Sequence, residues 1–476
     1  MERPPPVPDL DWSPERAHEF AGALVGVWTE LLESLRDGPV VPPDLTTQAV
    51  REAVSLDVPE EGMPQDELVA YLRRAVLDYS LKSGHPAHLA YITGTGTIPG
   101  AAADLLASGL NANAGGWLLS PAATEIELQL TRWLAQRLGL PETAGGMIVA
   151  GGGVANFIAL KVARDAMAGT DTRRAGVTTP LAIYCSDEAH VTVHRAADML
   201  GLGTDSVRHV SADGLEDALL PDRPGIVVGT AGTTSTGVIE PLARLAGIAE
   251  RHGMWFHVDA AYGGAIALSD RLRPLLDGID RADSVTLDPH KWLSTPLGSG
   301  CIVVRDTEKL SESFGVTAAY VHEEEGVDRG LNLGFMGPQF SRGFDALKVW
   351  VSLLAHGRGA YARRIEHDIE LTDYLAARVE EHPDFELLAT GLSICCFRYR
   401  PAGLDDEEEL NRLNESLLTE LQMDGRVFPS NAIVDGRFCL RTCIVNFRTE
   451  AEDLDRVLEV AAELGSMLLA STRSGA

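Results

Sequence analysis

One lysine stands where its amine could act as a nucleophile. Lys291 directly follows His290 in the stretch LDPHKW and is one of only five lysines among 40 lysines and arginines. Residues 284–287 predict a short buried strand that Pro289 ends, so Lys291 is expected at a strand end. Burial can turn a lysine into an amine that forms a Schiff base, whereas arginine stays protonated. A solvated surface lysine is the simpler alternative, and rarity alone does not exclude it.

Three glycines lie between a predicted strand and a predicted helix in VAGGGVANFIALKVARD, residues 149–165. Glycines in such a turn let backbone N–H groups approach a phosphate at the positive end of the helix. A tight turn without a ligand explains this motif alone equally well. The motif departs from a dinucleotide-binding fingerprint, because Asn156 stands where the third glycine belongs and no acidic residue ends the next strand at the expected spacing.

Two further polar residues follow predicted strands. His190 lies between a strand and a helix in CSDEAHVTVHRAADMLG, where its ring could stack on a planar group or form an ordinary surface hydrogen bond. Asp259 ends the apolar strand in MWFHVDAAYGG. A buried aspartate needs a cationic partner, and a protonated pyridine nitrogen would be one, although a helix N-cap role is also open.

Together these positions supply a phosphate cradle, a stacking histidine, a carboxylate and an amine at the ends of predicted strands. Open parallel sheets bind their ligands at such strand ends. Pyridoxal 5'-phosphate requires this combination, because it carries an anionic phosphate, a pyridinium ring and an aldehyde that an amine captures. The set therefore predicts this cofactor, whereas an NAD-dependent oxidoreductase would leave Lys291 unexplained.

The chain resembles the pyridoxal-phosphate-dependent group II amino-acid decarboxylases over nearly its whole length. The motifs that carry the resemblance are HPAHLAYI (85–92), GGWLLSPAATEIE (115–127), GGGVANFIAL (151–160), CSDEAHVTVHRA (185–196), GTTSTG (232–237), HVDAAYGG (257–264), DPHKW (288–292) and LRTCIVNFRT (440–449). The resemblance implies an α/β fold of type I, that of aspartate aminotransferase. The second motif favours the aromatic-L-amino-acid branch of the family.

The resemblance also implies roles for individual residues. Lys291 would hold the cofactor covalently, Asp259 would pair with the ring nitrogen, and His190 would stack on the ring. The further cofactor contacts that it implies are Gly152, Gly153, Thr234, Ala261, Asp288 and His290. The implied reaction converts an L-amino acid, aromatic or otherwise hydrophobic, to its amine and carbon dioxide, and no metal is expected.

The chain departs from its aromatic relatives at the residue that returns a proton to Cα. Those relatives usually carry a tyrosine on a mobile loop, and a gapless alignment places Leu333 at that position. Tyr320, just before the acidic stretch HEEEG, is the substitute that we expect. Four pocket positions also differ in size or polarity from aromatic relatives, namely Ser83, Ile92, Gly94 and Gly115.

Three alternatives therefore stay open. The missing tyrosine favours decarboxylation coupled to oxidative deamination, which yields an aldehyde, ammonia and peroxide. A non-aromatic substrate, such as glutamate, aspartate or diaminobutyrate, is the second alternative. The third is a protein that binds pyridoxal phosphate without turnover.

Three regions must position these residues. Residues 1–85 predict a helical arm that begins at the N-cap Ser13 and lacks a core of its own, so we expect it to pack on a second copy in a homodimer. Residues 86–345 alternate short apolar strands with helices, which predicts a large domain with a mostly parallel sheet. Residues 346–476 predict a small α+β domain.

Composition excludes several classes of partner. A formal net charge of −29 argues against nucleic acid and against anionic membrane surfaces. The six cysteines lie in apolar segments without the spacing of zinc ligands, which predicts reduced thiols. The start lacks the apolar segment of a signal peptide and no run reaches membrane-spanning length, so we expect a cytoplasmic enzyme.

Overall fold

The computed structural model describes residue 3 and residues 10–43, 45–221, 223, 225–315 and 330–474. A seven-stranded sheet forms the centre of the large domain, in the order β1-β7-β6-β5-β4-β2-β3. Its strands are β1 (Gly145–Val149), β2 (Ala182–Cys185), β3 (Val207–His209), β4 (Gly225–Thr230), β5 (Trp255–Asp259), β6 (Ser284–Leu287) and β7 (Gly300–Val304). Strand β7 is antiparallel to both neighbours and the other pairs are parallel, so the predicted mostly parallel sheet is confirmed.

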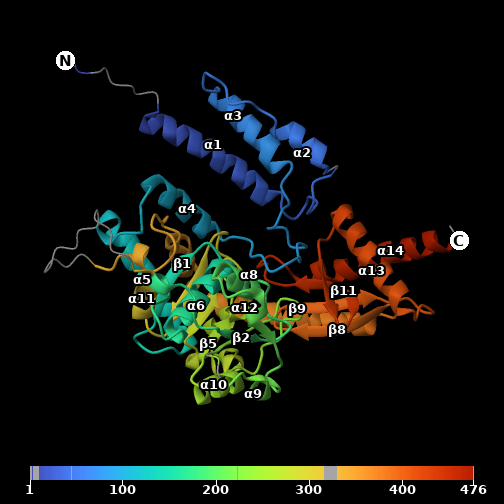
Figure 1. Cartoon of the computed structure of the whole chain (residues 1–476). Coiled ribbons are helices and arrows are strands. Elements are labelled where there is room, and N and C mark those ends of the chain that lie inside the picture. Colours follow the sequence, from blue (N-terminus) through green and yellow to red (C-terminus); the bar gives the residue numbers. More distant parts are fainter. Residues whose placement is uncertain are drawn as a thin grey trace.

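Helices cover both faces of this sheet (Figure 1). The helices of the large domain are α4 (Ile98–Leu110), α5 (Pro121–Leu138), α6 (Gly152–Met167), α7 (Thr172–Ala175), α8 (Thr192–Met199), α9 (Leu215–Ala218), α10 (Leu242–Arg251) and α11 (Glu308–Phe314), of which α5, α6, α8 and α10 pack on the sheet. Alternate strand residues face opposite sides, so Ile148 packs with α5 in one apolar cluster while Met147 packs with α6 in another. The two-sided burial explains why the sequence shows continuous apolar runs.

A smaller antiparallel sheet forms the C-terminal domain, in the order β10-β11-β9-β8. Its elements are β8 (Phe385–Gly391), β9 (Ile394–Tyr399), α13 (Glu407–Asp424), β10 (Ser430–Val434), β11 (Arg437–Cys443) and α14 (Ala451–Ser474). The long helix α12 (Ala346–Glu381) connects the two domains and bends at Gly357, whose φ is 73°. The sequence predicts a long helix from Ala346 to about His367, and this prediction ends the helix too early.

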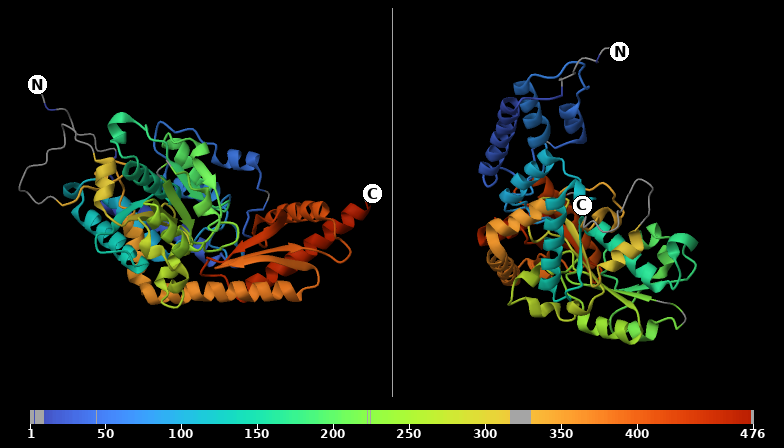
Figure 2. Two further views of the ribbon diagram at one scale, coloured as in Figure 1. Left: turned by 60° about the horizontal axis from the view of Figure 1, so that its bottom comes forward. Right: turned by 90° about the vertical axis from the view of Figure 1, so that its left-hand side faces the viewer.

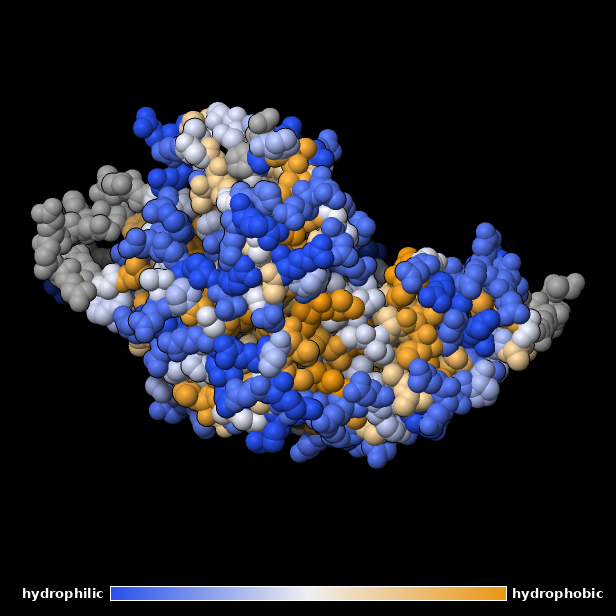
Figure 3. All heavy atoms as spheres, turned by 90° about the horizontal axis from the view of Figure 1, so that it is seen from below, coloured by the Kyte–Doolittle hydropathy of each residue, from blue (hydrophilic) through white to orange (hydrophobic). Residues whose placement is uncertain are grey.

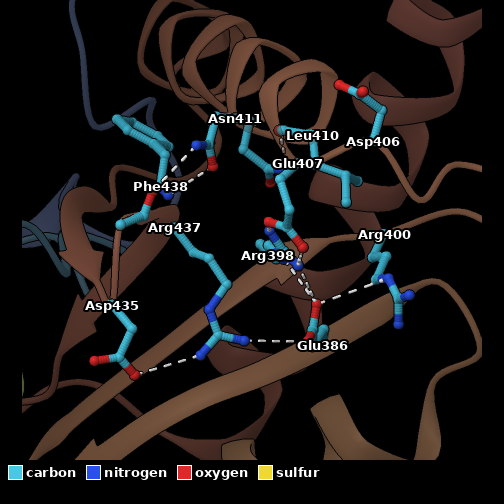
Figure 4. Close-up of polar contacts among 12 residues, drawn as sticks. Glu386, Arg398, Arg400, Asp406, Glu407, Leu410, Asn411, Asp435, Arg437 and Phe438 are labelled. Atoms are coloured by element: carbon cyan, nitrogen blue, oxygen red, sulfur yellow. Dashed lines mark hydrogen bonds and ion pairs between the residues drawn. The ribbon is translucent and has the colours of Figure 1, made fainter.

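A buried arginine holds the C-terminal sheet to its covering helix (Figure 4). The Arg398 side chain is 1% exposed, and its guanidinium contacts Glu386 at 2.7 Å and Glu407 at 2.6 Å. Glu386 also pairs with Arg437 at 3.4 Å. These contacts join β8, β9, β11 and the first turn of α13.

The N-terminal helices stand clear of the two domains (Figures 1 and 2). They are α1 (Pro14–Glu33), α2 (Thr47–Val54) and α3 (Gln65–Leu72), with a short π-helical turn, Arg73–Leu77, after α3. Ser13 caps α1 by accepting the Arg16 N–H, as its position before Pro14 predicts. Val27 is the one buried residue of α1 among those described, so the apolar side of the arm is largely uncovered.

The described residues include no helix long and apolar enough to cross a membrane. Seen from below, the surface is hydrophilic over much of its area, with apolar side chains gathered at its centre and on the C-terminal domain (Figure 3).

Candidate active site

Lys291 lies in the turn after β6 and pairs with a buried carboxylate. Its Nζ is 3.3 Å from Asp288 Oδ2, and the lysine side chain is 23% exposed, so a small molecule can reach the amine. Burial raises the pKa of the Asp288 carboxyl, although Lys291 and His290 oppose that rise. The next residue, Trp292, is fixed by donating its indole N–H to Asp368 of α12 over 2.8 Å.

His290 borders the same carboxylate. Its Nε2 lies 3.7 Å from Asp288 Oδ2, and its Nδ1 donates to the Ser299 carbonyl over 2.8 Å. Burial is the main cause that lowers the pKa of this histidine. The backbone around Lys291 is held by Gly94, whose N–H donates to the His290 carbonyl over 3.1 Å.

The glycine turn faces this cluster. Gly152 opens α6, and a Cβ there would lie 2.6 Å from Asp288 Oδ2, so no side chain fits without movement. A Cβ on Gly153 would lie 3.3 Å from Thr192 Cγ2. The backbone at the positive end of α6 is thus open to an anion, with Lys291 and His290 beside it.

Asp259 is the last residue of β5 and is almost fully buried. Its Oδ1 accepts the Ala261 N–H over 3.1 Å, and the Ala261 carbonyl accepts the Asp288 N–H over 3.1 Å. Asp259 and the lysine turn are therefore joined through two backbone hydrogen bonds. This contact places the predicted aspartate, alanine and lysine motifs together at the carboxyl ends of β5 and β6.

His190 follows β2 and presents an exposed ring. Its Nδ1 lies 2.9 Å from the Thr192 hydroxyl and 3.3 Å from the Thr192 N–H. Partial burial lowers the pKa of His190, while the nearby Asp259 charge acts in the opposite direction. The exposed ring leaves one side available for stacking on a planar group.

Two residues of the site were not assigned a role from the sequence. The Asn156 amide donates to Asp259 Oδ2 over 2.7 Å and to Thr192 Oγ1 over 3.0 Å, and so connects the aspartate to the segment that carries His190. In the sequence, Asn156 only shows that the glycine motif departs from a dinucleotide-binding fingerprint. Its contacts come from strands and helices about 40 to 100 residues away, which no local pattern shows.

The second is Arg441 of β11. It is 3% exposed, and its Nη1 donates to the Tyr91 carbonyl over 3.4 Å and to Ser430 Oγ over 3.1 Å. Its Nε and Nη2 have no hydrogen-bond partner within the described ranges. Burial raises the pKa of the Tyr262 hydroxyl, and the Arg441 charge opposes that rise. An incompletely paired guanidinium thus contacts the Tyr91 carbonyl, three residues before Gly94, and its charge acts on Tyr262, three residues after Asp259.

Three positions that the sequence singles out are not found in this cluster of described side chains. Thr234 is exposed in the turn after β4, and no hydrogen bond joins it to the other site residues among those described. Leu333 is fully buried with Met336 in the apolar core. Tyr320 lies outside the described residues.

The residues fit pyridoxal phosphate. The glycine turn has no room for side chains beside Asp288, Lys291 is accessible, His190 offers an exposed ring, and Asp259 lies at a strand end where a ring nitrogen could reach it. Lys291, Asp259, His190 and the glycine turn are the groups that would hold the aldehyde, the ring nitrogen, the ring face and the phosphate.

Comparisons with known proteins agree with this chemistry. Residues 48–400 match the family described as the pyridoxal-dependent decarboxylase conserved domain. The aromatic-L-amino-acid decarboxylase of Bacillus atrophaeus is 32% identical over 94% of this chain and 95% of its own length. The cysteine sulfinic acid decarboxylase of Homo sapiens is 31% identical over 86% of this chain and 87% of its own length.

A crystal structure of Oryza sativa TDC with PLP and tryptamine shares the fold with a TM-score of 0.89 and 27% identity, covering 96% of this chain and 99% of that one. The predicted type I fold and the predicted cofactor are thereby confirmed. The chain belongs to the pyridoxal-dependent decarboxylase family and is a pyridoxal-phosphate-dependent amino-acid decarboxylase, a carbon–carbon lyase.

Proposed function

We propose that Lys291 anchors pyridoxal phosphate covalently, that Asp259 pairs with its ring nitrogen and that His190 covers one face of the ring. The position of Asp288 is the main support for this proposal. Its carboxylate contacts the Lys291 amine at 3.3 Å and lies so close to Gly152 that no side chain fits there. The amine and the phosphate turn are thereby held side by side. When bound, the cofactor supplies an electron sink for the bond between Cα and the carboxylate.

The other predicted contacts complete this assignment. Gly152 and Gly153 bind the phosphate with their backbone, and His290 borders it. Ala261 orients Asp259 through its N–H, and Asp288 keeps the Lys291 side chain directed at the site. Thr234 remains in the proposal from the sequence resemblance alone, and Tyr320 from its position beside the acidic stretch HEEEG.

The substrate that we propose is an aromatic or otherwise hydrophobic L-amino acid, as in the aromatic-L-amino-acid decarboxylase of B. atrophaeus. Arg441 is the group that we assign to the substrate carboxylate, because its Nε and Nη2 are buried and without partners in the described structure. A buried guanidinium with free donors favours a bidentate carboxylate. Once the carboxylate leaves as carbon dioxide, the product loses this contact, which favours its release.

A substrate panel tests this proposal. The purified enzyme, loaded with pyridoxal phosphate, is incubated with tryptophan, tyrosine, phenylalanine, glutamate, diaminobutyrate and cysteine sulfinate, and amine, aldehyde and peroxide are quantified. We expect amine from at least one aromatic amino acid. Turnover of acidic amino acids alone would contradict the proposed substrate class.

A second product is favoured by Leu333. This residue occupies the aligned position of the proton-donating tyrosine, carries no acidic proton, and is fully buried. Unless Tyr320 supplies the proton, oxygen-dependent deamination to an aldehyde competes with formation of the amine. In the same panel, aldehyde and peroxide without amine would establish this alternative.

We further propose a cytoplasmic homodimer with a helical arm (1–85), a large domain (86–345) and a small domain (346–476). The projecting arm and three exposed leucines of α4, Leu105, Leu106 and Leu110, support an interface with a second copy. The six cysteines are free and buried, which suits a reducing compartment. Sedimentation at micromolar concentration tests the assembly, and a mass of 51.0 kDa, that of one chain, would contradict it.

A further inference from the structure

Asn156 is a buried residue of α6, 2% exposed, with all its side-chain hydrogen-bonding atoms engaged. Its Nδ2 lies 2.7 Å from Asp259 Oδ2 and 3.0 Å from Thr192 Oγ1, and its Oδ1 lies 3.1 Å from His257 Nε2. The amide therefore connects β5, on which Asp259 and His257 lie, with the first turn of α8 beside His190.

The carboxylate of Asp259 fixes which way the amide points. Carboxylate oxygens accept hydrogen bonds, so the atom 2.7 Å from Asp259 Oδ2 must be the NH2 group of Asn156. The amide oxygen then faces His257 and accepts from it. A flipped amide would place two acceptor oxygens in contact in a buried site, at a large desolvation cost.

This orientation determines the tautomer of His257. Because Asn156 Oδ1 only accepts, His257 must carry its proton on Nε2. Burial lowers the pKa of His257 to about 4, so the ring is neutral and its Nδ1 is an acceptor at neutral pH. His257 Nδ1 lies 3.0 Å from the Ser284 hydroxyl and 3.2 Å from the Ser284 carbonyl. With the ring proton on Nε2, the hydroxyl is the group that donates to Nδ1, and Ser284 Oγ in turn accepts the Trp255 indole N–H over 2.9 Å.

The second N–H of the Asn156 amide influences which ring nitrogen of His190 carries the proton. Thr192 Oγ1 accepts from Asn156, which leaves the threonine hydroxyl proton free to donate to His190 Nδ1, 2.9 Å away. The Thr192 backbone N–H donates to the same nitrogen over 3.3 Å. With two donors aimed at Nδ1, the neutral ring carries its proton on Nε2.

We propose that Asn156 is a positioning residue whose single amide sets both the orientation of the Asp259 carboxylate and the tautomer of His190. All donors from Trp255 to Asp259 then point in one direction, an arrangement in which hydrogen bonds strengthen one another. His190 presents Nε2 as a donor on the side away from Thr192, where the ring is exposed. The inference rests on the roles proposed for Asp259 and His190 and adds the residue that couples them.

The experiment records histidine tautomers directly. Protein labelled with 15N-histidine is studied at pH 7.5 by long-range 1H–15N correlation, with and without pyridoxal phosphate, and His257→Gln and His190→Gln assign the two signals. We expect protons on Nε2 of both rings in the wild-type protein. A proton on Nδ1 of His257 would overturn the proposal, and this readout needs no variant of Asn156.

Substitution at Asn156 tests the coupling. In Asn156→Asp an acceptor oxygen replaces the NH2 group, so we expect the His190 tautomer to become mixed and the Kd for pyridoxal phosphate to rise at least tenfold. Thr192→Val keeps the bond between Asn156 and Asp259, so we expect it to alter the His190 signal and leave His257 unchanged. If Asn156→Asp folds and retains wild-type tautomers and cofactor affinity, the inference fails.

A matched control comes from the small domain. Asn414 is also buried, donates to the Tyr399 carbonyl over 2.9 Å and accepts the Tyr399 N–H over 2.8 Å. Asn414→Asp is expected to lower stability without changing either histidine signal or the cofactor Kd. A wild-type protein that does not bind pyridoxal phosphate would overturn the proposed cofactor roles, whereas normal wild-type binding that Asn156→Asp leaves unaffected would overturn only this inference.

Discussion

Lys291 Nζ lies 3.3 Å from Asp288 Oδ2, and the carboxylate of this pair is almost completely buried while the amine remains accessible. The carboxylate also closes against Gly152, where a Cβ would lie 2.6 Å from the same oxygen. One aspartate therefore orients the amine and shapes the turn beside it. Other chain segments reinforce this position, since Gly94 holds the His290 carbonyl and Asp368 holds Trp292.

Asp288→Asn is expected to lower kcat/KM about tenfold to a hundredfold and to weaken cofactor binding. The substitution removes the charge from a hydrogen bond to Lys291, and such charged hydrogen bonds contribute about 1.5–3 kcal/mol. Steady-state kinetics and titration of the cofactor-free protein measure the two effects. Asp405→Asn, at an aspartate whose side chain is 81% exposed, is the control. Wild-type kinetics and affinity in Asp288→Asn would contradict this role.

Arg441→Met is expected to raise KM for the amino acid by about tenfold or more. The guanidinium that we assign to the substrate carboxylate is lost, whereas the product amine has no carboxylate to lose. Inhibition by the product amine should therefore change much less than KM. Arg437→Met, which alters a partly exposed arginine of the same strand, serves as the control. Equal weakening of substrate and product would assign Arg441 to the structure of the sheet instead.

Acid is expected to destabilise the fold through three neutral buried histidines. Burial lowers the pKa of His85, His88 and His257 from 6.5 to about 4. The unfolded chain binds a proton on these histidines more readily than the folded chain does. The stability of the fold is therefore unaffected by these groups above pH 6.5 and decreases as the pH falls from 6.5 to 4. Each histidine accounts for about 2 kcal/mol between pH 7.5 and pH 5.

Urea unfolding at both pH values measures this loss. His88, which stacks on Phe428 with ring centroids 5.5 Å apart, is the residue to replace, because His88→Gln removes one titrating group outside the catalytic cluster. The difference in unfolding free energy between the two pH values should shrink by about 2 kcal/mol in that variant. An undiminished difference would show that His88 does not titrate as described.

Glu386→Ala is expected to destabilise the small domain by about 1–3 kcal/mol, because it leaves the buried Arg398 guanidinium with one carboxylate partner in place of two. Thermal unfolding with catalytic activity as a second readout measures the change. Glu408→Ala is the matched control, since the Glu408 side chain is 88% exposed and contacts only Arg412 of its own helix among the described ion pairs. Equal melting temperatures for the two variants would show that the ion pair between Arg398 and Glu386 does not stabilise the small domain.

The sequence predicts those parts of this fold that depend on local patterns. Short apolar runs mark β1, β2 and β4 to β7, and therefore the strand ends where Asp259 and Lys291 lie. Strand β3 has three residues, of which only Val207 is buried, so it carries no periodic signal. Helix α12 continues past Gly357 because Leu371, Leu375 and Val379 keep its apolar side buried against the C-terminal sheet.

Other features depend on contacts between distant segments. Asn156 and Arg441 acquire their importance from neighbours on other strands and helices, and a single asparagine in a helix or arginine in a strand has no local signature of that role. A buried charged residue in an apolar strand such as RFCLRTC was the available signal for Arg441. Fold and cofactor were thus predictable, whereas the residues that connect the catalytic groups required the structure.

The proposed mechanism depends on the covalent link at Lys291, and hydride reduction followed by peptide mass spectrometry detects that link. Reduction of the loaded enzyme with borohydride should fix the pyridoxyl phosphate group on the peptide that contains Lys291, at near one group per chain. Lys291→Ala should carry none, while Lys309→Ala, at an exposed lysine paired with Glu312, should be labelled like the wild type. An adduct on another lysine, or no adduct in an enzyme that turns over, would show that Lys291 does not hold the cofactor.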